Sequence, residues 1–251
     1  TLPLSINGKP FSQKRSFIND DVIITKAQSK SGLFYTCSNG KEWVSDCSLG
    51  PHPDSLTLLR KNADALYFFY KYCLIEQAVN QGWSMPQQWK QPLEKLANKF
   101  VSLWNTYGQF GQFLNIETGT IVVGGCNSAS SAIGGLALAY QFENNPEFLR
   151  VAKEAARYYY NKFIKEGISC GGPGEILQNP DSESAFAMLE SLIALYEVTK
   201  EKEWLDYAEV TAGLGSTWVV SYDYNFPDSS VFGRLGMKTN GSVWANTQNK
   251  H

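Results

Sequence analysis

The feature that most constrains the fold of this chain is an internal repeat in its second half. A shift of 56 residues superimposes similar residues, namely Leu136 on Leu192, Tyr140 on Tyr196 and Ala152 on Ala208. The same shift places the segment "EFLRVA", from Glu147, on "EWLDYA", from Glu203. Self-similarity at a fixed period of this length is typical of stacked supersecondary units. The sequence therefore predicts a repeat architecture.

The repeated unit is expected to be a helical hairpin. Apolar residues recur every three or four positions in six segments, which indicates helices. The six expected helices cover roughly 56–73, 93–107, 129–143, 147–165, 182–199 and 202–220. Only short loops separate the third helix from the fourth and the fifth from the sixth. We therefore expect each of these pairs to form an antiparallel hairpin.

The two helices of each repeated hairpin differ in polarity. The first contains the segment "AIGGLALAY", which has no charge before Glu143, and its counterpart at 182–199 carries only Glu190 in its middle. The second helices are amphipathic, with charges such as Arg150 and Lys153 on one face. A helix that is apolar all round is buried, whereas an amphipathic helix faces water on one side. The sequence predicts an inner layer of first helices and an outer layer of second helices.

The first 50 residues are expected to form a β segment that precedes a helical domain at 51–251. Residues 22–25, "VIIT", are one strand candidate. A hairpin is expected around Asn39-Gly40, because Asn-Gly between two β-prone arms suits a two-residue type I′ turn. Cys37 and Cys47 flank this hairpin and could pair across it, while buried free thiols are the alternative for most of the five cysteines.

The inner and outer helices, the glycine-rich loops at 124–125 and 171–174, and the abundant Trp and Tyr together resemble the six-hairpin (α/α)6 toroid glycosidase-like superfamily. The resemblance covers roughly residues 52–251 and rests on architecture. It implies a mainly α fold of antiparallel helical hairpins, and an enzyme that acts on carbohydrate. The chain supplies about three hairpins, whereas the toroid has six. Half a toroid would expose apolar inner helices, so we expect downstream sequence or a second chain to supply the other half.

Charge and composition exclude several other classes of function. The formal net charge is −2, which gives no reason to expect a nucleic-acid partner. No uncharged apolar stretch is long enough to span a membrane, and no Cys/His spacing indicates a metal site. We expect no cofactor. The chain begins Thr-Leu-Pro without a signal peptide, which a removed leader would explain, and the expected location is periplasmic or secreted.

Polar residues of the kind used by hydrolases or lyases occur in four loops that would lead into inner helices on one face of a toroid. The first loop holds His52, the second Asn127, the third Glu175, Asp181 and Glu183, and the fourth Trp244, Gln248, Asn249 and His251. Glycoside hydrolysis generally needs two carboxyl groups, one to protonate the leaving oxygen and one to attack or to activate water. Glu175, Asp181 and Glu183 are therefore the candidate catalytic residues. The residues of the other three loops are the candidates for substrate binding.

Each carboxylate also has a structural interpretation. Asp181 precedes an apolar helix and suits its N-cap, and Glu183 in the first turn favours the helix dipole. Under the 56-residue shift Glu183 coincides with Asn127, which favours a shared role in ligand contact. No helix requires Glu175, whose alternative is a solvated loop position.

The function expected from the sequence is a carbohydrate-active enzyme, and the leading hypothesis is a glycoside hydrolase that degrades an oligo- or polysaccharide. A polysaccharide lyase or a sugar epimerase on the same scaffold is the first alternative. In the lyase interpretation, Asn249 would neutralise a uronate while His251 moves protons. A non-catalytic glycan-binding or scaffold domain is the second alternative.

Overall fold

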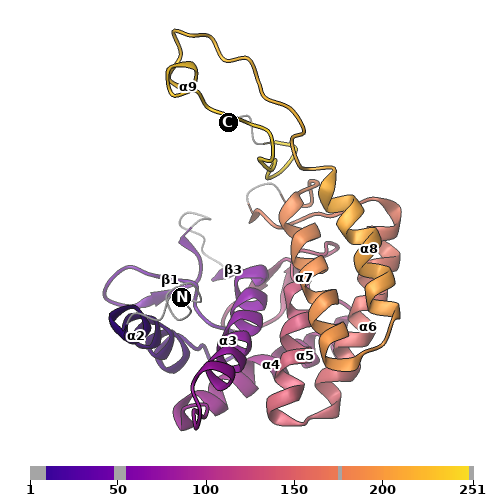
Figure 1. Ribbon diagram of the computed structural model, residues 1–251. Coiled ribbons are helices and arrows are strands. Elements are labelled where there is room, and N and C mark those ends of the chain that lie inside the picture. The colour runs from indigo at the N-terminus through magenta and orange to yellow at the C-terminus, as the bar shows by residue number, and fades with distance from the viewer. Residues whose placement is uncertain (1–9, 48–54, 175–176, 249–251) are drawn as a thin grey trace.

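The computed structural model of the protein describes residues 10–47, 55–174 and 177–248. Its main body consists of three antiparallel helical hairpins (Figure 1). They pair α3 (Leu59–Val79) with α4 (Gln87–Tyr107), α5 (Ser131–Glu143) with α6 (Pro146–Lys162), and α7 (Ser182–Thr199) with α8 (Glu203–Ser216). The mainly α fold and the six helices predicted from the sequence are confirmed.

The helices form the two layers that the polarity pattern predicts. Helix α5 packs between α3 and α7, and α6 and α8 cover the outside of α5 and α7. Residues 131–139 of α5 are all buried. Two glycines allow the close approach, because a Cβ at Gly134 would lie 2.9 Å from the Tyr67 ring and one at Gly135 would lie 2.8 Å from Leu66. Helices α3, α5 and α7 therefore form a tightly packed inner layer.

The outer helices are linked by charged and aromatic side chains. Arg157 on α6 pairs with Glu203 on α8, with 2.7 Å between Nη2 and Oε2. The rings of Tyr160 and Tyr207 stack beside this pair with their centroids 3.7 Å apart. These contacts join adjacent hairpins on the water-facing side.

The 56-residue repeat holds at the C-terminal ends of the inner helices. Asn144 and Lys200 end α5 and α7 in the left-handed conformation, and their N–H groups donate to the carbonyls of Tyr140 and Tyr196 at 2.9 and 2.7 Å. The repeat fails at the other end, because α7 begins more than a turn earlier than the shift predicts.

The predicted equivalence of Asn127 and Glu183 is consequently wrong. Asn127 lies in the loop before α5, whereas Glu183 lies in the first turn of α7.

The expected strand at residues 22–25 is also wrong, since these residues belong to helix α2 (Pro10–Lys26). The helix packs against α4: Ile24 is buried, Phe17 stacks on Trp89 at 5.4 Å, and Asp21 accepts a 2.8 Å hydrogen bond from the Trp89 indole. The β preference of "VIIT" is weak, and this packing overrides it.

A hairpin around Asn39-Gly40 is confirmed, with β1 (Cys37–Ser38) paired to β2 (Trp43–Val44). Its loop has four residues rather than the predicted two. The Asn39 carboxamide accepts hydrogen bonds from the backbone N–H groups of Lys41 and Glu42 at 2.9 and 3.0 Å, and this stabilises the longer turn. Cys37 and Cys47 form a disulfide, while Cys73, Cys126 and Cys170 are buried free thiols.

The first inner helix starts later than expected. Leu56 lies in strand β3 (Leu56–Leu58), which pairs with β4 (Phe113–Asn115), and β4 pairs with β5 (Ile121–Val123). Helix α3 therefore begins at Leu59, whose N–H donates to the Gln112 carbonyl at 2.8 Å. A short 3-10 turn, η2 (Ile164–Glu166), follows α6.

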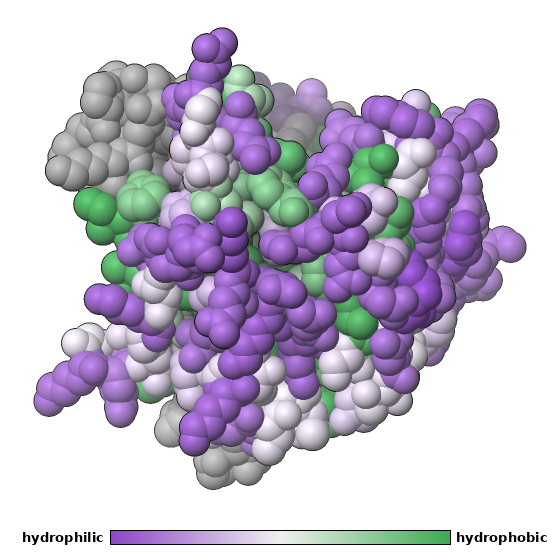
Figure 2. All heavy atoms as spheres, turned by 90° about the horizontal axis from the view of Figure 1, so that it is seen from below, coloured by the Kyte–Doolittle hydropathy of each residue, from purple (hydrophilic) through white to green (hydrophobic). Residues whose placement is uncertain are grey.

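Residues 217–248 form an arm that extends beyond the helical body and carries α9 (Val231–Arg234) (Figure 1). The two sides of the arm meet at a bridge between Val219 and Val243, and the returning side pairs with Asp181 through Asn246. The face seen from below is largely hydrophilic, with apolar side chains in separate patches (Figure 2). Within the described ranges, no helix is long and apolar enough to cross a membrane.

Candidate active site

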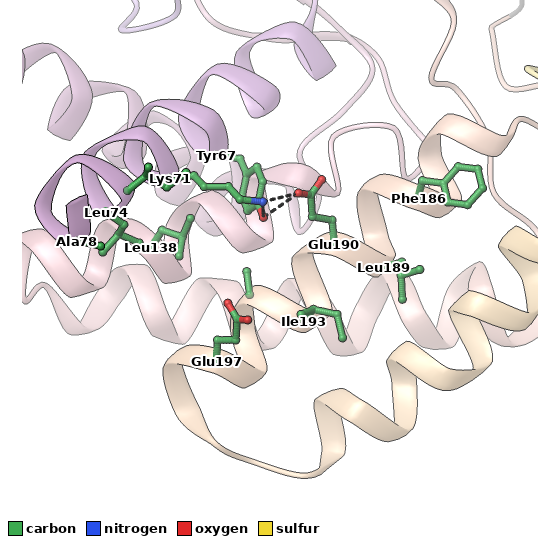
Figure 3. Close-up of a pocket in the computed structure, with 12 residues that line it drawn as sticks. Tyr67, Lys71, Leu74, Ala78, Leu138, Phe186, Leu189, Glu190, Ile193 and Glu197 are labelled. Atoms are coloured by element: carbon green, nitrogen blue, oxygen red, sulfur yellow. Dashed lines mark hydrogen bonds and ion pairs between the residues drawn. The ribbon is translucent and has the colours of Figure 1, made fainter. Parts of the chain in front are cut away.

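A groove runs along the inner layer between α3 and α7, over α5 (Figure 3). Its main part has a volume of about 560 Å³, and a second part of about 250 Å³ continues toward the N-terminal ends of the helices. The two parts share Tyr67, Phe186 and Glu190. We refer to both parts together as the inner groove.

The inner groove owes its polar lining to helical spacing. Arg60, Asp64, Tyr67 and Lys71 follow one another at three- and four-residue intervals, which places them on one face of α3. Helix α7 presents Glu183, Glu190 and Glu197 at intervals of two turns. These two faces oppose each other across the groove.

Arg60 joins two carboxylates near the N-terminal ends of the helices. Its Nε lies 3.5 Å from Asp64 Oδ2, and its Nη1 forms an ion pair with Glu183 Oε2 across the groove. The Ser131 hydroxyl on α5 donates a 2.7 Å hydrogen bond to Asp64 Oδ1. Glu183 remains open to solvent, with 37% of its side chain exposed.

The electrostatic environment of Asp64 suits a proton donor. Burial raises the pKa of Asp64, the Ser131 hydrogen bond and the Arg60 charge oppose this rise, and the charge of Glu190 adds to it. A carboxyl group whose pKa is raised holds its proton closer to neutral pH, which is the property of a general acid.

A second cluster crosses the groove one to two turns further along. Lys71 Nζ donates to Glu190 Oε1 at 2.7 Å and to the Tyr67 hydroxyl at 2.9 Å, and the Tyr67 hydroxyl donates to Glu190 Oε1 at 3.1 Å (Figure 3). Burial raises the pKa of Tyr67 to about 12, so its phenol keeps its proton at neutral pH. Glu190 is thereby fixed as an acceptor on the α7 wall.

Beyond this cluster the groove becomes apolar. Leu74 and Ala78 of α3, Leu138 of α5 and Ile193 of α7 line it, and Glu197 lies beside them (Figure 3). Ile193 is 37% exposed, as expected for an inner helix whose apolar side has no cover within the described residues. The groove therefore has a charged end and an apolar end.

Asp181 is the N-cap of α7, as its structural interpretation predicts. Its buried carboxylate accepts hydrogen bonds from the N–H groups of Ser184 and Gly172, at 2.6 and 2.9 Å, and from the Ser184 hydroxyl at 3.1 Å. Burial raises its pKa, and these three hydrogen bonds oppose the rise. Asp181 thus fastens the loop at 170–174 to the start of α7, and a catalytic role for it stays a prediction.

Three other candidate residues that the structure describes lie outside the inner groove. Asn127 is buried and accepts a 2.9 Å hydrogen bond from the Cys170 N–H. Trp244 lies on the arm, where it lines a separate cavity of about 450 Å³ with Tyr224 and Phe232. Gln248 is exposed, and its N–H donates to Asn246 Oδ1 at 2.9 Å.

Among the predicted site residues that the structure describes, Glu183 alone lines the inner groove. Glu175, His52, Asn249 and His251 lie outside the described residues.

The predicted convergence of loops is confirmed for three of the four. Asn127 in the second loop contacts Cys170 in the third, and Gln178 of the third donates to the Gly124 carbonyl of the second. The fourth joins them through the Ser182 N–H, which donates to the Ala245 carbonyl at 3.0 Å. These loops meet beside the N-terminus of α7, where the charged end of the groove begins.

Sequence reasoning missed Arg60, Asp64, Tyr67, Lys71 and Glu190 because it searched the loops and assigned the inner helices to the core. Two signals were present. Arg60, Asp64 and Lys71 are charges spaced four and seven residues apart in the first inner helix, and Glu190 is an isolated carboxylate in the middle of another. A charge on a helix expected to be buried requires either a partner or a cavity.

Comparison with known proteins gives the class of fold. No family model and no curated protein matches the sequence. Solved structures do match: cellobiose 2-epimerase from Spirochaeta thermophila has a TM-score of 0.58 and 14% identity over 84% of this chain and 55% of that chain. D-mannose isomerase has a TM-score of 0.56 and 14% identity over 84% and 51%.

Unsaturated glucuronyl hydrolase from Bacillus sp. GL1, described as responsible for the degradation of glycosaminoglycan, has a TM-score of 0.59 and 14% identity over 86% of this chain and 59% of that chain. At these identities the likeness shows the fold alone, and this chain is similar in fold to part of each of these proteins. The chain spans between about half and three fifths of the length of these proteins.

Proposed function

We propose that the protein is a carbohydrate-active enzyme of the glycoside hydrolase type and that the charged end of the inner groove is its active site. One observation carries the proposal: Arg60 holds two carboxylates, Asp64 and Glu183, on opposite walls of a solvent-open groove. Glycoside hydrolysis needs two carboxyl groups that flank the scissile bond. The (α/α)6 fold, which this chain shares with three carbohydrate-acting proteins, supports a saccharide substrate.

Within this proposal, Asp64 is the general acid and Glu183 is the nucleophile or general base. Burial favours the protonated form of Asp64, which gives its proton to the glycosidic oxygen. Glu183 forms the ion pair with Arg60, and in this proposal it either attacks the anomeric carbon or removes a proton from water. Glu190, held by Lys71 and Tyr67, accepts hydrogen bonds from sugar hydroxyls.

The experiment is a screen of the purified protein for release of reducing sugar from a glycan panel, followed by assays of D64N and E183Q. General acid or base catalysis contributes about 10²–10⁴-fold, so each variant should lose activity by about that factor. Glu209→Gln, an exposed carboxylate on α8, is the matched control and should retain wild-type turnover. Wild-type turnover in both groove variants would place the chemistry elsewhere, with Glu175 as the next residue to test.

The Tyr67–Lys71–Glu190 cluster favours an epimerase or a lyase as the second candidate, because a phenol beside an ammonium group and a carboxylate can move a proton at a sugar carbon. An epimerase interconverts free sugars without cleavage, and a lyase produces an unsaturated sugar that absorbs ultraviolet light. Either product separates these activities from hydrolysis, which forms new reducing ends without an epimerised or an unsaturated sugar. Binding without any of these products would indicate a glycan-binding domain.

We further propose that additional helical hairpins, in the same or a second chain, cover the apolar end of the groove. The exposed apolar side chains Phe68, Phe186 and Ile193 on the inner helices support this. An extracytoplasmic location is proposed as well, and the Cys37–Cys47 disulfide supports it because such bonds persist in oxidising compartments.

A further inference from the structure

We propose that the inner groove accepts an uncharged sugar unit and discriminates against a uronate, an inference that rests on the proposed function. The three structural relatives leave this choice open, because one is named for a glucuronyl substrate and two for cellobiose and mannose. The charges that line the groove favour an uncharged sugar over a uronate.

Carboxylates outnumber cations in the described lining of the inner groove. The cations are Arg60 and Lys71, and the carboxylates are Glu183, Glu190 and Glu197, to which Asp64 adds a carboxyl group whose neutral form burial favours. The paired side chains are partly exposed, from 24% for Arg60 to 44% for Glu190, so water and salt screen part of this charge. A ligand carboxylate that enters the groove therefore meets a surplus of like charge.

Both cations are also already occupied by carboxylates of the groove itself. Arg60 contacts Asp64 at 3.5 Å and forms the ion pair with Glu183, and Lys71 lies 2.7 Å from Glu190. A uronate would have to displace one of these partners and leave it without its cation beside the incoming charge. Separating an ion pair in this way costs free energy, because the carboxylate that is left behind no longer has a cation beside it.

An uncharged sugar finds complementary groups in the same place. Glu183, Glu190 and Glu197 follow one another at steps of about 10 Å along α7, so one sugar unit can donate a hydroxyl hydrogen bond to any one of them. These bonds break neither ion pair, and charge-assisted hydrogen bonds of this kind are stronger than neutral ones. The C–H faces of the ring suit the apolar walls formed by Phe186 and Ile193. Glu197 has no ion-pair partner among the described residues, so it is the acceptor most free to engage a ligand.

A uronate in the groove would also act on the two carboxyl groups of the proposed chemistry. The charge of Glu190 already raises the pKa of Asp64, although it lies on the opposite wall. A further anion in the groove acts on Asp64 in the same direction. It also acts on Glu183, whose ionised form the proposed chemistry needs. A bound uronate would therefore oppose the charge that Glu183 needs as nucleophile or base.

The test is a comparison of matched neutral and acidic sugars on the full chain. Chemical-shift titrations with D-glucose and D-glucuronate, and with D-mannose and D-mannuronate, give the two affinities of each pair at pH 7. We expect the neutral member to bind at least about tenfold more tightly, a difference of about 1.4 kcal/mol. The preference should shrink when NaCl is raised from about 20 mM to about 300 mM, because salt screens the repulsion.

Two charge reversals separate the groove from the overall charge of the protein. Glu197→Lys removes a groove carboxylate and should narrow the preference by at least about threefold, which is about 0.6 kcal/mol. Glu209→Lys, on the exposed face of α8, changes the net charge equally and should leave the preference unchanged.

The titrations can overturn the inference in two ways. Equal or tighter binding of the uronates, or equal effects of the two reversals, overturns the inference and leaves the proposed function standing. Absence of binding by all four sugars, at concentrations up to those at which weak millimolar ligands saturate, overturns this inference together with the assignment of the groove as a saccharide site.

Discussion

Ser131, the first residue of α5, donates a 2.7 Å hydrogen bond to Asp64 on α3, and this bond ties the buried centre of the inner layer to the charged end of the groove. Ser131 is itself buried, whereas Asp64 borders the cavity. The hydrogen bond and Arg60 only partly offset the loss of water around the Asp64 carboxylate, because the net effect on its pKa is a rise. Asp64 is therefore held in an environment that favours its neutral form.

Asp64→Asn should raise stability at neutral pH. A carboxyl whose pKa is raised in the folded state contributes stability that is present below its unfolded pKa of about 3.8 and is lost as pH rises through the folded value. Asparagine has no charge to desolvate, so the variant should melt at a higher temperature than wild type at pH 7. Thermal melts should show the two proteins converging as the pH is lowered toward 3. A variant that melts lower at pH 7 would mean that the Arg60 ion pair outweighs the burial.

Asp181→Asn should have the opposite effect on stability, although burial raises the pKa of this carboxyl as well. Asp181 accepts hydrogen bonds from two backbone N–H groups and from one hydroxyl, and an asparagine amide would point a donor at a donor. Loss of a buried hydrogen bond of this kind costs about 1–3 kcal/mol. Denaturant titrations would measure the loss. Unchanged stability would show that Asp181 does not hold the loop at 170–174 to the start of α7.

Gly134→Ala should destabilise the inner layer and disturb the second groove cluster. The added Cβ would lie 2.9 Å from the Tyr67 ring and 3.0 Å from Ser191 Oγ, so the Tyr67 side chain must shift from its contact with Glu190. Overpacking of this kind costs about 1–3 kcal/mol.

Gly213→Ala on α8 is the matched control for this substitution. No heavy atom of the described residues lies within 4 Å of its added Cβ, and replacement of a helical glycine by alanine stabilises by about 1 kcal/mol. Denaturant titrations of both variants provide the comparison. Equal effects would show that α3 and α5 are not packed as closely as described.

Removal of the Cys37–Cys47 disulfide should lower stability. The bond closes a loop with a sequence separation of 10 residues around the β1–β2 hairpin. Native disulfides of this size constrain the unfolded chain and contribute about 2 kcal/mol. A double Cys→Ser variant should melt at a lower temperature than wild type, and added reductant should lower the wild-type melting temperature but not that of the variant. Insensitivity of the wild type to reductant would contradict the disulfide.

The helical architecture was predictable because apolar residues recur at helical spacing along each segment of the sequence. Polarity separates the inner helices from the outer ones, and the repeat fixes hairpin ends such as Asn144 and Lys200, whose left-handed caps are equivalent. The residues at 22–25 were not predictable in the same way. Their helix depends on packing against Trp89, more than 60 residues away in sequence.

In the candidate site, too, the local features were predictable and the contacts between distant segments were not. Glu183 and the capping of α7 by Asp181 follow from residues adjacent in sequence. The pairing of Arg60 with Glu183 and of Lys71 with Glu190 depends on how α3 and α7 face each other across α5, which no local pattern specifies. The repeat also misled at Asn127, because the loops before α5 and α7 differ in length even though the helices end alike.

The most direct test of the central claim is a crystal structure of the Asp64→Asn variant with a saccharide that the wild-type protein processes. The account predicts that the sugar lies between α3 and α7, with its scissile bond within hydrogen-bonding distance of residue 64 and of Glu183. A sugar held instead in the arm cavity beside Trp244, or at the loops away from the groove, would contradict it.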